Sequence, residues 1–148
     1  ARLVEGLGVL DWDVVAAGLG ASYAGGRAAM RAAFADLHDE AFHGWRKRAK
    51  DLWYQAQVLE GSCPPQLRAL TEQLAELGDQ LGEDHDLAVL AAAAAASPAL
   101  GERLNARHAQ LRRAAWQLGR RIYAERPRAF LRRMQVYWQV WREGETAD

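Results

Sequence analysis

The stretch HGWRKRAKDLWYQ, residues 43–55, indicates how this part of the chain folds and which of its faces is unusual. Apolar residues recur in it every three or four positions, the spacing of one face of an α-helix. Continued to residue 59, this spacing predicts a buried stripe of Trp45, Ala49, Leu52, Ala56 and Leu59. The opposite arc carries His43, Arg46, Lys47, Lys50 and Tyr54. No acidic residue lies between residues 44 and 50, so no carboxylate within this segment offsets the positive charge of the arc.

The rest of the chain also has the composition of an all-α protein. Alanine, leucine, arginine and glutamine dominate, and no stretch alternates apolar with polar residues as a strand does. Glycine and proline pairs divide the chain into helices predicted at 12–35, 38–60, 65–96, 99–125 and 127–142. Pro127 either opens a new helix or kinks a long one. We therefore expect a four-helix bundle with a short or kinked additional C-terminal helix.

Two more predicted helices repeat the division into an apolar and a basic arc. The apolar arcs are Leu111, Ala115, Leu118 and Ile122 in the fourth helix, and Phe130, Met134, Tyr137 and Trp141 in the last. Basic side chains lie away from the predicted core at Arg27, Arg31, Arg113, Arg120, Arg128 and Arg132. The first two and the last two of these are one helical turn apart. We predict that the basic arcs of several helices converge on one concave face.

Length and composition limit the classes of protein that need to be considered. With 148 residues, 50% of them hydrophobic, residues 1–148 fit a single domain. Lys and Arg number 19, as do Asp and Glu, so any anion site must come from local clustering. A lone Cys63 favours a reducing, cytoplasmic location. The apolar run at 87–96 is too short to cross a membrane. We expect no secretory leader, and a start at Ala1 is compatible with a piece of a longer protein.

Like charges one helical turn apart repel, so the basic arc at residues 43–54 needs a compensating negative charge. One candidate is a carboxylate from a neighbouring helix, and Asp86 could pair with Arg46 or Lys47 if the two helices pack antiparallel. Another is an external polyanion. A solvated surface without a ligand stays open as a third interpretation.

The same residues carry a resemblance to a known family. The pattern H-x-x-R-K-x-x-K-x-x-x-Y, followed some thirty residues later by L-G-x-x-x-D, resembles the CHAD domain, a conserved histidine α-helical domain. Here it is formed by His43, Arg46, Lys47, Lys50, Tyr54, Leu81, Gly82 and Asp86. The flanks YAGGRAAMR (23–31) and LGRRIYAERPRAFLRRM (118–134) are similar to the first and closing helices of the family. Gly44 and Trp53 depart from its pattern.

The resemblance implies a module that binds inorganic polyphosphate without catalysis or cofactor and associates with polyphosphate granules. Family members contain two similar bundles around a basic channel, so this chain resembles one half, most like the C-terminal half. A second similar bundle, in this or another chain, is then an expected partner. The residues that the resemblance assigns to polyphosphate are Arg27, Arg31, His43, Arg46, Lys47, Lys50, Tyr54, Arg113, Arg120, Arg128 and Arg132.

Other functions receive less support from the sequence. RNA binding and docking of an acidic protein partner stay open, because rows of cations that hold one phosphate chain can hold another. Glu40 and His43 match the E-x-x-H element of di-iron bundles, but no second copy is present. His38-Asp39 and His85-Asp86 match only two residues of metal-dependent phosphohydrolases. No glycine-rich phosphate loop occurs, so we expect no enzyme, no metal and no cofactor.

Overall fold

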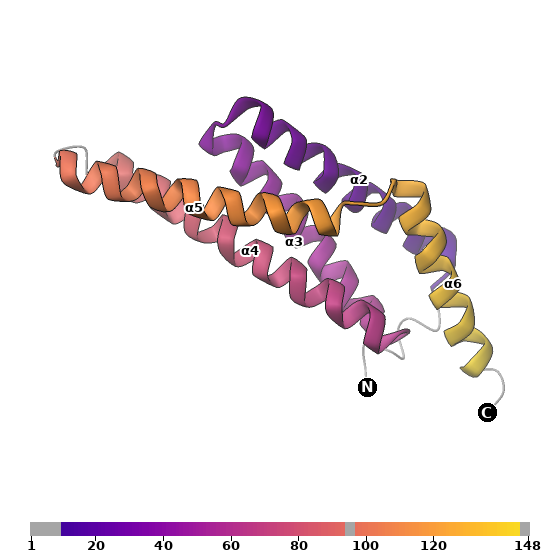
Figure 1. Cartoon of the computed structure of the whole chain (residues 1–148). Coiled ribbons are helices and arrows are strands. Elements are labelled where there is room, and N and C mark those ends of the chain that lie inside the picture. Colours follow the sequence, from indigo (N-terminus) through magenta and orange to yellow (C-terminus); the bar gives the residue numbers. More distant parts are fainter. Residues whose placement is uncertain (1–9, 94–96, 146–148) are drawn as a thin grey trace.

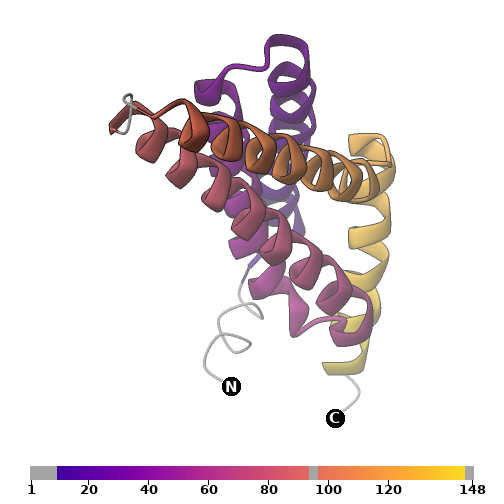
Figure 2. The ribbon, with the colours of Figure 1, turned by 60° about the vertical axis from the view of Figure 1, so that its left-hand side comes forward.

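The computed structural model describes residues 10–93 and 97–145, and within these ranges it contains helices and no strand. The helices are α2 (Trp12–Asp36), α3 (Asp39–Glu60), α4 (Pro64–Ala93), α5 (Pro98–Ile122) and α6 (Pro127–Glu145). Helices α2 to α5 enclose a common core, and α6 lies along the outside of α2 (Figures 1 and 2). The predicted all-α bundle with an additional C-terminal helix is therefore confirmed.

The helix boundaries follow the breakers in the sequence, with one correction and one alternative resolved. The fourth helix ends at Ile122 and not at residue 125, because Tyr123 leaves helical geometry while its N–H still bonds to the carbonyl of Gly119 at 2.9 Å. Pro127 opens a separate helix and does not kink a longer one. Residues 94–96, at the end of the predicted third helix, lie outside the described residues.

The predicted buried stripes on α3 and α5 are confirmed. Trp45, Ala49 and Leu52 are fully buried, and so is Ala115 on α5. Helix α6 differs, since Phe130, Met134 and Trp138 are buried, while the predicted Tyr137 and Trp141 are only partly covered. The reason is that, among the helices that the structure describes, α6 packs against α2 alone, so only a narrow stripe at four-residue spacing is covered.

Helices α3 and α5 lie diagonally across the bundle. Both pack against α4, and in the described part of the chain no backbone contact joins α3 to α5. Their buried stripes face each other, since a Cβ on Gly119 of α5 would come within 2.7 Å of the Trp45 ring. The arcs opposite these stripes must therefore point to opposite sides of the molecule.

None of the described helices is both long enough and apolar enough to span a membrane.

Candidate functional site

The basic arc of α3 borders an open groove against α4. Arg46, Lys50, Trp53 and Tyr54 form one wall, and the other wall comes from Leu74, Ala75, Gly78 and Asp79. The groove has a volume of about 320 Å³. His43 and Lys47 continue the α3 wall toward the N-terminus of the helix, and His85 faces His43 from α4. We call His43, Arg46, Lys47, Lys50, Tyr54 and His85 the α3–α4 basic surface.

Glycine on α4 lets Arg46 lie close to the helix backbone. A Cβ on Gly82 would be 3.4 Å from both the Nε and Nη2 atoms of Arg46, so the guanidinium occupies the space that a larger residue would fill. The Nε atom of Arg46 is buried and has no hydrogen-bond partner among the described residues. An unsatisfied buried donor costs free energy, which an incoming acceptor would recover.

The His43 and His85 rings stack on each other. Their centroids are 4.4 Å apart and the ring planes differ by 25°. The Nδ1 atom of His43 is buried without a partner in the described structure. Burial lowers the pKa of His43, and the neighbouring His85, Lys47 and Arg46 lower it further against the opposing effect of Glu40. The free protein therefore holds His43 largely neutral at pH 7.

The described carboxylates do not neutralise this surface. Ion pairs within 4.0 Å occupy other cations, at Arg48, Arg68, Arg107, Arg112 and Arg133. None of those pairs includes Arg46, Lys47 or Lys50, and Asp86 forms none with Arg46 or Lys47. Asp79 is the acidic residue that lines the groove. The α3–α4 basic surface therefore keeps its positive charges available for an external anion.

Asp84, two positions before Asp86 on α4, is an acidic residue that forms ion pairs inside the bundle. It is 2% exposed and accepts hydrogen bonds from Arg112, at 2.9 Å from Nε and 3.1 Å from Nη2. His108 Nδ1 lies 2.7 Å from the same carboxylate. Arg112 also donates to Asp39 at 2.6 Å and lies 4.0 Å from the centre of the Phe42 ring. This cluster joins α3, α4 and α5.

The other predicted binding residues lie apart from the α3–α4 basic surface. Arg27 donates from Nε to the carbonyl of Tyr123 at 3.2 Å, at the end of α5. Arg113 and Arg120 are exposed on the outer arc of α5, which points away from α3 across the bundle. Arg128 and Arg132 are exposed on α6, which packs on α2. The predicted convergence on one concave face is thus not what these helices produce.

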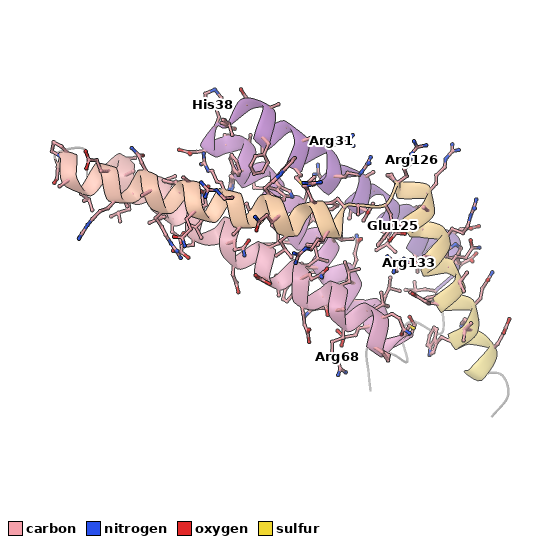
Figure 3. The ribbon with its side chains drawn as sticks, viewed as in Figure 1. Arg31, His38, Arg68, Glu125, Arg126 and Arg133 are labelled. Atoms are coloured by element: carbon pink, nitrogen blue, oxygen red, sulfur yellow. The ribbon has the colours of Figure 1, made fainter. Side chains whose placement is uncertain are left out.

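Figure 3 shows how arginines are distributed around the rest of the molecule. Arg31 extends from α2 and Arg126 lies beside the connection from α5 to α6, whereas Arg68 lies near the start of α4 and pairs with Glu60 at 3.2 Å. At the start of α6, Arg133 is fixed by Glu125 at 2.6 Å.

Sequence reasoning missed His85, Gly78 and the Arg112–Asp84 pairing. His85 was noted only beside Asp86, and no local pattern links it to His43, 42 positions earlier. A usable signal was Gly82, because a glycine inside a helix leaves room for the close approach of another group, which here is the Arg46 guanidinium.

The residues behind the metal-site alternatives have other contacts. His38 lies 3.5 Å from Asp36, and Asp39 accepts from Arg112. Across residues 10–93 and 97–145, no three His, Cys, Asp or Glu side chains are grouped so that they could hold a metal ion.

Comparison with known proteins supports the resemblance seen in the sequence. The sequence model of the family described as the CHAD domain matches residues 5–95, more than half of the chain. No curated protein and no solved structure matches the chain significantly. The matched range includes the whole α3–α4 basic surface, whereas Arg113, Arg120, Arg128 and Arg132 lie beyond it.

Proposed function

The chain belongs to the CHAD domain family, and we propose that it binds inorganic polyphosphate, without turnover, on the α3–α4 basic surface. The family is known in polyphosphate-related proteins. The observation that carries the proposal is the row of Arg46, Lys47 and Lys50 beside the groove, with no carboxylate of residues 10–93 or 97–145 within ion-pair distance.

The chemistry of this surface suits a chain of phosphates. Lys47 and Lys50 offer exposed ammonium groups, and Arg46 offers a guanidinium that can hold a phosphate through two parallel hydrogen bonds. Tyr54 is 54% exposed and can donate its hydroxyl to a phosphate oxygen.

RNA is the second candidate, because one feature of the groove favours it. Trp53 and Tyr54 lie with ring centroids 4.9 Å apart beside Arg46 and Lys50. Exposed aromatic rings next to cations are how proteins stack the bases of single-stranded nucleic acid. Polyphosphate has no bases and gains nothing from such stacking.

A competition experiment separates the two ligands. Long-chain polyphosphate and single-stranded RNA of equal charge are titrated against the protein across a salt series, and polyphosphate is expected to bind more tightly at every salt concentration. Trp53→Ala is the discriminating variant. It should leave polyphosphate affinity within about twofold, while an RNA site would lose about 1 to 3 kcal/mol for each stacked base. Tighter binding of RNA throughout the series would overturn the proposal.

Asp79 supplies a further prediction, because it is the acid that faces the groove. Asp79→Asn removes a negative charge that repels the ligand, and polyphosphate affinity is expected to rise by about twofold to fivefold at low salt. Fluorescence titration of the variant measures the change. Glu72→Gln is the matched control, since Glu72 is exposed on the same helix and does not line the groove. An equal gain in both variants would show that total charge, and not the groove, sets affinity.

Further features follow from the family as proposals. We propose that the protein acts in the cytoplasm, associates with polyphosphate granules, and is completed by a second similar helical bundle in the same or another chain.

A further inference from the structure

We propose that His43 and His85 form a proton-dependent element of the α3–α4 basic surface, so that a phosphate chain binds together with a proton and binds more tightly as pH falls. This inference rests on the proposed function and adds His85 of α4 as a binding residue. It also gives the site a regulator, the local proton concentration.

The geometry of the pair is unusual for two histidines that only fill space. The rings stack 4.4 Å apart, so two protonated imidazoles would repel each other strongly at this distance. The buried Nδ1 of His43 has no hydrogen-bond partner in the described structure. A structural histidine would direct that nitrogen to a carbonyl or carboxylate. None of the residues that the structure describes fills this role for His43.

The charged groups around His43 come from both helices. On α3 these are Arg46, Lys47 and Glu40, and on α4 the facing group is His85. Asp86 follows His85 on α4 but is exposed and makes no ion pair with Arg46 or Lys47. Positive neighbours outnumber the one acid, and together with burial they lower the pKa of His43. The free site therefore disfavours the imidazolium.

A bound phosphate chain reverses this balance. Its negative charges offset Arg46 and Lys47 and accept hydrogen bonds, so the charged imidazole becomes the stable form and the pKa of His43 rises. The complex then holds more protons than the free protein. By linkage, affinity increases as pH falls through the range in which His43 titrates. One added proton can change affinity by at most about tenfold per pH unit.

The ligand does not supply this pH dependence. Internal phosphates of a long chain keep one negative charge each, as the phosphates of a nucleic-acid backbone do, while histidine is the side chain that titrates between about pH 5 and 8. A pH-dependent affinity for long-chain polyphosphate therefore reports groups on the protein.

The test is polyphosphate titration of the full chain between about pH 6 and 8, with calorimetry in two buffers of different ionisation enthalpy to count protons taken up. The wild-type protein is expected to gain about tenfold in affinity from pH 8 to pH 6, which corresponds to an average uptake of about half a proton over that range. His43→Gln and His85→Gln should flatten this dependence. His85→Arg should keep tight binding at pH 8, because the cation is then permanent.

His38→Gln is the matched control, since His38 is an exposed histidine that lies beside Asp36 and outside the surface. It should keep the full pH dependence. This inference is wrong if polyphosphate binds with the same affinity at every pH, or if the glutamine variants retain the wild-type dependence of log affinity on pH. The proposed function would still stand in either case. Failure to bind polyphosphate at any pH overturns both.

Discussion

Replacing both Arg46 and Lys50 with alanine is expected to weaken polyphosphate binding by about 150-fold or more. Each side chain lines the groove, and each can make a hydrogen bond of the charge-assisted kind, which contributes about 1.5 to 3 kcal/mol when the partner is charged. The slope of log affinity against log salt should also become shallower by about 1.4, because two contacts no longer release counterions. Helicity by circular dichroism should not change.

The α5 arginines provide the control for charge alone. Arg113→Ala with Arg120→Ala also removes two positive charges, but from an exposed arc on the far side of the bundle. Charges that distant are largely screened at moderate salt, so affinity should fall by less than about threefold. Equal losses in the two double variants would contradict a localised site and would indicate binding over the whole surface.

The guanidinium of Arg46 lies against Gly82, so its removal could also change the packing of α3 on α4. A second double variant, which leaves Arg46 in place, separates that effect from the loss of a ligand contact. Lys47→Ala with Lys50→Ala changes only exposed side chains, and it should also weaken binding by at least about tenfold. Unfolding midpoints of both pairs show whether any loss of affinity comes from loss of the fold.

The largest expected effect on stability is that of Asp84→Ala, about 3 kcal/mol. The substitution leaves Arg112, 17% exposed, and the part-buried His108 without the carboxylate that both contact. Arg112 keeps its pair with Asp39, whose side chain is 64% exposed, but the part of the guanidinium that faced Asp84 must either stay desolvated or open the interface between α4 and α5 to water. Urea denaturation followed by circular dichroism measures the loss, which for a chain of this size corresponds to a fall in melting temperature of roughly 6 to 12 °C.

Asp86→Ala is the matched comparison, because Asp86 is exposed two positions further along the same helix. Its effect should stay within about 0.5 kcal/mol. If Asp86→Ala lowers the free energy of unfolding as much as Asp84→Ala does, the buried cluster is not the main source of stability. Pairing of Asp86 with Arg46 or Lys47 would then explain the result better.

Most of the secondary structure was predictable, because helix signals are local. The spacing of Trp45, Ala49 and Leu52 identified the buried face of α3, and proline and glycine gave helix ends within about three residues. The stripe on α6 was predicted less well. Its burial depends on how many helices cover it, and of the described helices only α2 packs on α6, a fact that the sequence of α6 does not contain.

The sequence by itself determined that α3 has a basic arc opposite its buried stripe, because a residue's position around a helix depends only on its distance along the chain. It could not determine how separate helices turn those arcs toward or away from each other. That depends on contacts between residues far apart in sequence, such as Trp45 with Gly119 and His43 with His85. Only the tertiary structure therefore decided that α5 carries its arginines to the far side, and that Asp84 and not Asp86 forms an internal ion pair. It also decided that Arg46, Lys47 and Lys50 form no ion pair with any described carboxylate.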